Sequence, residues 1–231
     1  MKRQELGLNI IKYVALFIIL LFLLFPLYWV LMTSFKTNME AYRSVPTFIP
    51  AEPTVQSYIN LFTKNNDFFV YYKNNFIVSG ATALITTVLA ILSGYALSRF
   101  HFRWNAWVTA ALLSSQMFPV VSRMISLYDL MNKMHLINTH PGLIFALTAA
   151  MLPFTVMLMS SFFDGVPREV EEAAYVDGAS RLQVLWRIVT PLVKPGMLAV
   201  AIYAFLMTWD DYLHAVTLIQ NDALRTMSAG V

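Results

Sequence analysis

Long uncharged apolar runs, separated by charged segments, dominate the hydrophobic pattern of this chain. A helix needs about twenty mostly apolar residues to cross a bilayer, and four runs of about this length carry no charge. A fifth run contains Asp210 and Asp211 but is apolar around them. The pattern therefore predicts an all-α membrane protein, a polytopic helical bundle with five spans. The five runs cover Tyr13–Met32, Phe76–Leu97, Trp104–Ser122, Pro141–Phe163 and Pro195–Ile219.

Two segments between the runs have patterns of their own. Thr33–Asn75 is polar and contains several prolines and asparagines, which predicts a partly irregular loop. Arg123–His140 is amphipathic, too short and too charged to span, and Pro119 just before it is expected to kink the end of the third run. One helical face of this second segment carries Met124, Leu127, Tyr128, Met131 and Leu136.

The segment Asp164–Lys194 is the one long, strongly charged stretch between two apolar runs. Pro167 suits the first position of a helix, where a missing N–H costs nothing. The acids that follow it then lie near the positive end of the helix dipole. Asp177-Gly178 predicts a turn, because glycine adopts the left-handed conformation that ends many helices. The sequence thus indicates a short helix that ends at this glycine.

A second short helix is predicted directly after the turn. Ser180 and Gln183 have the spacing of a capping box, in which each side chain bonds the backbone of the other residue. Thr190-Pro191 is expected to end this helix, because proline lacks the N–H that continues it. Its predicted apolar face consists of Leu182, Leu185, Trp186 and Val189.

Composition places the chain in a membrane. The 231 residues are 58% hydrophobic and 13% charged, with a mean hydropathy of +0.60, whereas soluble domains have about 25% charged residues. The formal net charge of +3 points to no polyanionic partner. The lack of cysteine excludes disulfides, thiolate metal sites and cysteine nucleophiles. The four histidines are scattered, so no metal site is predicted.

The first run is interpreted as a retained span with a cytoplasmic N-terminus. It is too long for a signal peptide, and no small-residue cleavage site follows it. Five spans then place the turn at Arg99–Arg103 and the segment Asp164–Lys194 on the cytoplasmic side as well. Nine of the sixteen Lys and Arg residues lie inside in this arrangement, in agreement with the positive-inside rule.

The charged segment resembles the EAA loop of ABC-importer permeases. Glu172-Ala173-Ala174, Gly178, Ile188 and Pro191 have the order and spacing of that loop, with Thr190 where leucine is commonest. The resemblance implies a cytoplasmic loop that docks into a cleft of an ATPase subunit. A surface-lying amphipathic loop without a partner is the alternative. A DNA-binding helix-turn-helix is disfavoured, because acids outnumber bases in this segment and spans flank it.

Further stretches resemble the maltose-G-type permeases. These are Pro26–Lys36, Phe48–Pro50, Gly94–Phe100 and Trp209–Tyr212, with Asp210 replacing the commoner asparagine. The resemblance covers most of the chain and implies one transmembrane permease domain over residues 1–231, with the type I ABC importer permease fold. Members of that group have six spans, so a sixth, C-terminal span is expected to be missing from this sequence.

The resemblance also implies partners and roles. The partners are a second homologous permease, an ATPase dimer and an extracytoplasmic sugar-binding protein, in a bacterial or archaeal plasma membrane. The substrate is a carbohydrate, lipid surrounds the spans, and no nucleic acid is involved. This chain binds no cofactor, and ATP and Mg²⁺ belong to the ATPase subunits. Glu172 contacts the ATPase, Ala173 and Ala174 allow close approach, Gly178 sets the turn, and Ile188 with Pro191 seats the second helix.

A substrate path is a second candidate site. Asp210 and Asp211 either line it, with Trp209 and Tyr212 stacking on a sugar, or lie at a wet helix end. Gln116 is predicted mid-way along the third span, where it lines the path or bonds between helices.

Other functions stay open at this stage. They are an ABC permease for an amino acid or phosphate, a standalone channel, and a membrane enzyme. A catalytic role is disfavoured, because no phosphate loop, nucleophile motif or metal motif is present.

Overall fold

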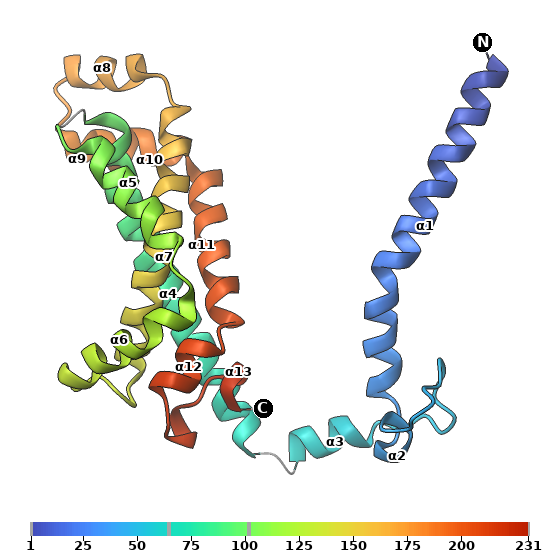
Figure 1. Cartoon of the computed structure of the whole chain (residues 1–231). Coiled ribbons are helices and arrows are strands. Elements are labelled where there is room, and N and C mark those ends of the chain that lie inside the picture. Colours follow the sequence, from blue (N-terminus) through green and yellow to red (C-terminus); the bar gives the residue numbers. More distant parts are fainter. Residues whose placement is uncertain (1, 64–65, 101–102, 231) are drawn as a thin grey trace. The chain divides into compact units, whose positions relative to one another are not determined.

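The computed structural model describes residues 2–63, 66–100 and 103–230, and every regular element within these ranges is a helix (Figure 1). The chain divides into two compact units, Met1–Asn66 and Asp67–Val231. The turn predicted between Arg99 and Arg103 includes residues 101–102, which lie outside the described ranges.

The first unit begins with one long apolar helix. Helix α1 (Lys2–Ser34) contains a candidate span at Ile11–Ser34, and none of its most apolar window is buried within the chain. The first apolar run is therefore helical as predicted. A polar loop with two short helices follows, α2 (Asn38–Ala41) and α3 (Gln56–Thr63).

The loop after α1 is more ordered than its composition suggests. Glu40 is buried and accepts hydrogen bonds from the Thr47 hydroxyl at 2.6 Å and the Ala51 amide at 3.0 Å. These bonds hold the pKa of the Glu40 carboxyl below its ordinary value. Lys36, also buried, donates to the Thr47 carbonyl and lies 4.8 Å from the centre of the Trp29 ring. Two buried charged residues thus organise a segment expected to be partly irregular.

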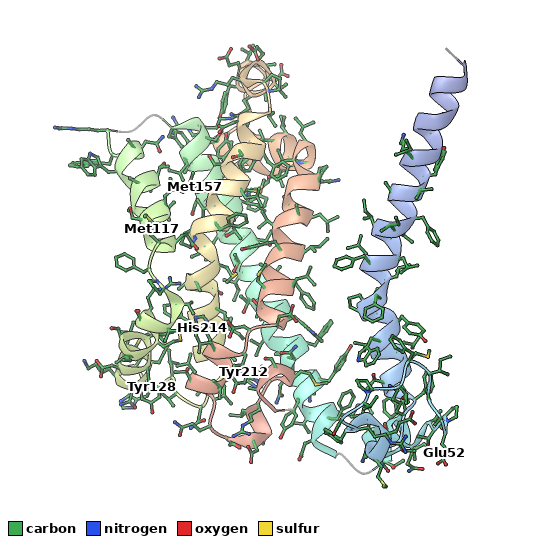
Figure 2. All side chains as sticks on the ribbon, turned by 45° about the vertical axis from the view of Figure 1, so that its right-hand side comes forward. Glu52, Met117, Tyr128, Met157, Tyr212 and His214 are labelled. Atoms are coloured by element: carbon green, nitrogen blue, oxygen red, sulfur yellow. The ribbon has the colours of Figure 1, made fainter. Side chains whose placement is uncertain are left out.

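The second unit is a bundle in which α4 (Asn66–Arg99), α7 (His140–Asp164) and α11 (Lys194–Trp209) run side by side (Figures 1 and 2). Helices α4 and α7 contain the second and fourth predicted runs, and both are candidate spans. Buried apolar side chains form two clusters. One includes Ile91, Met159, Phe163, Val184 and Val200, and the other includes Val78, Met131, Leu143, Leu147 and Leu218.

The third run is not one straight helix. It forms α5 (Asn105–Gln116) and α6 (Val120–Lys133), which meet at an angle of 103°. The break includes Pro119, which has no N–H to continue a helix, so the expected kink becomes a sharp bend. The predicted apolar face of α6 is confirmed: Met124 and Met131 are buried, and Leu127, Tyr128 and Leu136 pack against the core.

The fifth run is interrupted as well, so the continuous span predicted to Ile219 is wrong. Helix α11 ends at Trp209, and a separate helix α12 (Leu213–Leu218) follows. The Asp211 carboxylate accepts from the His214 amide at 2.9 Å, at the start of α12. Short acidic side chains bond nearby backbone groups in this way and favour helix ends. The chain continues through η2 (Asp222–Leu224) and α13 (Met227–Gly230).

Length and hydropathy identify three candidate spans in the described ranges, or up to five if each bent pair counts as one span. The second bent pair joins Arg181–Leu192 to α11 at 81°. The segment between α7 and α11 contains α8 (Arg168–Val176), α9 (Arg181–Gln183), the π-helix η1 (Val184–Val189) and α10 (Thr190–Leu192). The count of five spans stays a prediction.

Candidate functional site

Helix α8 begins within one residue of the predicted position and ends as its sequence signals predict. Pro167, predicted as the first helical residue, is the N-cap with φ of −58°, and the helix begins at Arg168. Gly178 has φ of +83°, and the Ala179 amide donates to the Ala174 carbonyl at 3.0 Å. The left-handed glycine and this backward hydrogen bond satisfy the free carbonyl at the end of the helix. The predicted turn is thus confirmed.

The second helix starts as predicted and then departs from prediction. Ser180 and Gln183 form both bonds of the capping box, at 3.4 Å and 2.8 Å. The next six residues wind as the wider π-helix η1. Thr190-Pro191 does not end the helix, which continues through α10 to Leu192 before bending into α11. Wide π turns and sharp bends often occur together.

The π-helix also changes which side chains are buried. Val184, Leu185 and Val189 are buried, whereas Leu182 is 66% exposed and Trp186 is 43% exposed. The predicted apolar face was therefore right for two of its four residues. The prediction assumed 3.6 residues per turn, and a π-helix has a longer repeat.

The residues of the EAA motif point in different directions. Glu172 and Ala173 are exposed, while Ala174 and the preceding Glu171 are buried. Val176, one turn after Ala173, is 88% exposed. Adjacent helical residues are about 100° apart, so α8 has one face toward the bundle and one face away from it.

The last two motif residues also differ in their surroundings. Ile188 is partly buried and packs against the cluster that contains Phe163, whereas Pro191 is exposed. The roles given to Ile188 and Pro191 in seating the second helix both stay predictions.

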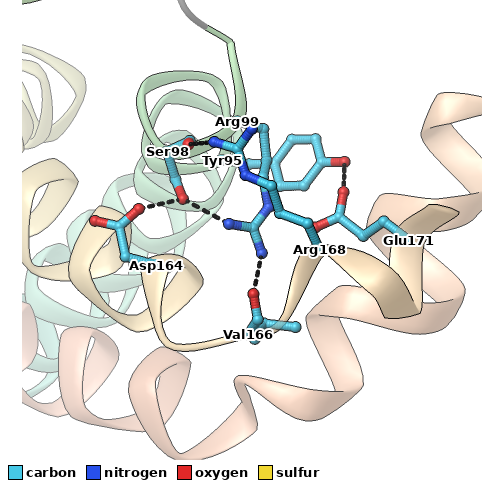
Figure 3. Close-up of polar contacts among 7 residues, drawn as sticks. All are labelled: Tyr95, Ser98, Arg99, Asp164, Val166, Arg168 and Glu171. Atoms are coloured by element: carbon cyan, nitrogen blue, oxygen red, sulfur yellow. Dashed lines mark hydrogen bonds and ion pairs between the residues drawn. The ribbon is translucent and has the colours of Figure 1, made fainter.

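A buried polar cluster joins α8 to the end of α4 (Figure 3). The Glu171 carboxylate accepts from Arg99 Nε at 2.5 Å and from the Tyr95 hydroxyl at 2.7 Å. The side chains of Arg99 and Glu171 are 8% and 6% exposed. Arg99 Nη2 also donates to the Val166 carbonyl at 2.8 Å. Removing one partner of such a buried ion pair strongly destabilises a protein, because the other charge stays buried without compensation.

Two further bonds extend this cluster, one to the end of α7 and one between α8 and α4. The Ser98 hydroxyl donates to Asp164 Oδ1 at 2.5 Å, and Arg168 Nη2 donates to the Ser98 carbonyl at 3.3 Å. Sequence reasoning missed all of these contacts. A weak signal was present, because Arg99 closes one helix and Glu171 opens another, where each charge suits the helix dipole.

A polar cavity of about 360 Å³ lies beside the cluster, between α8 and the end of α4. Arg181 lies over the Phe100 ring at 5.3 Å and forms part of the wall. The lining carries both signs of charge and comes from Tyr95, Arg99, Phe100, Arg168, Glu171, Glu172, Tyr175 and Arg181.

The predicted substrate-path residues do not form one stack. Trp209 is half-buried, stacked on Phe205 at 5.5 Å and edge-on to Tyr72. Asp210 and Tyr212 are exposed after the end of α11, and Asp211 pairs with the His214 ring. Figure 2 shows Tyr212 and His214 where α11 gives way to α12.

Gln116 is elsewhere, as the exposed last residue of α5. The third run bends just after it, and its place mid-way along a span stays a prediction. Within the described ranges, no group of three His, Asp or Glu side chains gathers that could hold a metal ion.

Comparison with known proteins identifies the family. Residues 86–230 match the family described as the binding-protein-dependent transport system inner membrane component. The chain belongs to this family. It is 32% identical over 221 residues to the sulfoquinovosyl glycerol transport system permease protein of Agrobacterium fabrum, covering 96% of this chain and 77% of that protein.

Two other relatives support the family and the fold. A diacetylchitobiose uptake system permease protein of Streptomyces coelicolor is 34% identical over 206 residues, covering 89% of this chain and 68% of that protein. A bacterial ABC transporter that imports the acidic polysaccharide alginate has a chain with a TM-score of 0.82 and 22% identity. The match covers 96% of this chain and 78% of that one. The predicted ABC importer permease fold is confirmed.

Proposed function

We propose that this chain is the permease subunit of an ATP-driven importer for a sugar or oligosaccharide. The main support for this proposal is the segment Asp164–Lys194, the coupling loop. In it, α8, the left-handed Gly178 and the Ser180 capping box form a defined helix-turn-helix between apolar helices. The named substrates of the two curated relatives, sulfoquinovosyl glycerol and diacetylchitobiose, favour a carbohydrate. The ATPase activity then belongs to partner chains, which also bind ATP and Mg²⁺.

The ATPase docks on the exposed face of α8 in this proposal. Ala173 allows a close approach, and Val176 offers an apolar side chain that is 88% exposed. Glu169 and Glu172 flank these residues and are exposed. Burying a valine side chain contributes roughly 1.5–3 kcal/mol, and the acids favour a cleft with basic groups at its edge.

Orientation and assembly follow from the same proposal. The N-terminus and the coupling loop face the cytoplasm, where an ATPase dimer binds, while a sugar-binding protein delivers substrate from the other side. A second homologous permease completes the path through a bacterial or archaeal plasma membrane. Closure of the ATPase dimer moves the coupling loop, and the spans change from inward-open to outward-open.

The substrate path is proposed near the break between α11 and α12. Tyr212 and Asp210 are exposed there, and a helix end gives carboxylates access to water that a mid-span position would deny. Trp209, the last residue of α11, completes the proposed set at this break. Gln116, at the end of α5, is proposed to line another part of the path.

Co-purification tests the proposal. The full chain is expressed with its second permease and ATPase, and ATPase recovery from membranes is compared for wild type, Glu172→Lys and Val176→Asp. Asp129→Lys is the matched control, because Asp129 is an exposed acid on α6. We expect wild type and the control to retain the ATPase and both α8 variants to lose most of it. Failure of wild type to retain any ATPase would refute the coupling role.

A transport assay then tests the substrate class. The complex is reconstituted in liposomes with its binding protein, and import of labelled sugars is compared with import of amino acids and phosphate. Import of a sugar supports the proposal. Import of an amino acid or phosphate alone would refute the carbohydrate assignment, and uptake that continues without the ATPase would indicate a channel.

A further inference from the structure

The contact between α4 and α8 is the strongest feature that docking of the ATPase does not explain. Arg99 and Glu171 are 72 residues apart in the chain, yet their side chains meet in a buried position. Neither residue lies on the exposed face of α8. Their contact therefore lies inside the permease and not on the surface that a partner would cover.

The polar atoms of this contact are fully used. Both oxygens of Glu171 accept a bond, one from Arg99 Nε and one from the Tyr95 hydroxyl. The three nitrogens of Arg99 donate to Glu171, Ser98 and Val166. A planar guanidinium can make these bonds together, whereas a lysine ammonium cannot reproduce the same fork.

Packing around the pair fixes its position further. The Tyr95 ring meets the Phe163 ring of α7 edge-on, with centroids 5.4 Å apart. Ser98 bonds Asp164 at the end of α7. The ends of α4 and α7 and the first turn of α8 are thus joined by side chains that leave little freedom for relative motion.

A buried ion pair is weak support for stability alone. Its desolvation cost often cancels the attraction, and apolar residues of similar volume can replace it without loss. What the pair does supply is a fixed orientation of two helices. If α8 changed its angle to the bundle when the ATPase moved it, part of that movement would not be transmitted to the spans.

The geometry points to a mechanical role for Tyr95, Arg99 and Glu171, which we call the α4–α8 latch. The latch makes α4 follow α8 when the ATPase moves the coupling loop, and its members are positioning residues. This inference rests on the proposed function. It adds that docking of the ATPase and transmission of its motion use different residues at neighbouring positions of α8.

The test separates transmission from docking. The importer complex is reconstituted with its binding protein, and both ATPase retention and sugar moved per ATP hydrolysed are measured. The variants are Glu171→Gln, Arg99→Lys and Tyr95→Phe, with Asp129→Asn as the exposed control on α6. Tyr95→Phe keeps the ring contacts with Phe163, so it tests the hydroxyl without a change in packing.

The latch predicts normal ATPase retention with poor coupling. Sugar moved per ATP should fall on the order of tenfold in Glu171→Gln, since couplings between sites typically amount to about 5–150-fold. Tyr95→Phe should lower it by a smaller factor than Glu171→Gln, because only one of the two hydrogen bonds to the Glu171 carboxylate is removed and the ion pair with Arg99 stays. Arg99→Lys should also lower it, although the charge is kept.

A rescue experiment tests the mechanical role directly. The chain has no cysteine, so Tyr95→Cys and Glu171→Cys provide one cross-linking site between α4 and α8, where the two native side chains meet at 2.7 Å. This double variant should couple poorly without a reagent, and a short bifunctional thiol reagent should restore sugar moved per ATP. Failure to restore it would overturn the mechanical role.

The remaining outcomes distinguish the two proposals. Wild-type coupling in all three variants, with the ATPase retained, would overturn the latch alone. Loss of the ATPase in the latch variants but not in wild type would also overturn it, because the pair would then shape the docking surface. No ATPase on the wild-type complex would overturn the coupling role and the latch together.

Discussion

Substituting Gly178 gives a prediction whose size follows from the backbone. A β-carbon built at this position meets no atom within 4 Å, so steric crowding contributes nothing. The cost of Gly178→Ala is then the cost of the left-handed conformation at φ of +83°, about 1–2 kcal/mol for an L-residue. Gly178→Asn should cost less, because asparagine adopts this conformation more readily. Gly178→Val should cost most, because a β-branched residue rarely has positive φ.

Two assays check this order. Hydrogen exchange at the Ala179 amide measures the turn directly, because this amide bonds the Ala174 carbonyl only when the turn is closed. A cost of 1–2 kcal/mol should raise its exchange about 5–30-fold. The amount of sugar moved per ATP should fall least in Gly178→Asn, more in Gly178→Ala and most in Gly178→Val. ATPase recovery after mild solubilisation should fall less in all three variants.

Either of two results would refute this reasoning. If alanine and asparagine at position 178 exchanged and transported equally, the left-handed conformation would not control the turn. If all three variants transported as wild type does, the turn would form without its glycine, and the assigned role of Gly178 would be wrong.

Three other changes have defined outcomes. Folding lowers the pKa of Glu40, so the Glu40 carboxylate stabilises the fold above its unfolded pKa of about 4.3, and this stabilisation is lost as the pH falls through the lowered pKa. Hydrogen exchange at the Ala51 amide should accelerate in that pH range, and Glu40→Gln should remove this pH dependence. Phe163→Ala empties a fully buried site and should lower the unfolding free energy by about 3–5 kcal/mol, measured by thermal unfolding in detergent. Ser180→Ala removes the cap bond to the Gln183 amide and should cost about 1 kcal/mol, seen as faster exchange at that amide.

Local chemistry explains why the end of α8 and the start of the second helix were predictable. The left-handed glycine and the capping box each depend on residues within five positions of one another. Such signals act before any tertiary contact forms, so the sequence alone carries them. Gly178 belongs both to this turn and to the motif that carried the family resemblance, and the family match confirms the fold.

Hydropathy predicted where apolar helices occur but not where they bend. The breaks after Gln116 and at Asp210 lie within runs that are apolar on average. The proline and the acidic residues there were visible in the sequence. Such residues can bend a helix, end it or be accommodated within it. The outcome depends on the neighbouring helices that satisfy the freed backbone groups.

Glu171 and Glu172 show why the inner half of the site could not be predicted. The two residues are identical in chemistry and adjacent, and only Glu172 belongs to the family motif. A helix turns about 100° between them, so one carboxylate is buried against Arg99 and the other is exposed. The choice depends on an arginine 72 residues away. The same charge-removing change at each position, Glu171→Gln and Glu172→Gln, should therefore give opposite defects: the first lowers transport per ATP with the ATPase retained, and the second weakens ATPase binding in a complex that remains coupled once assembled.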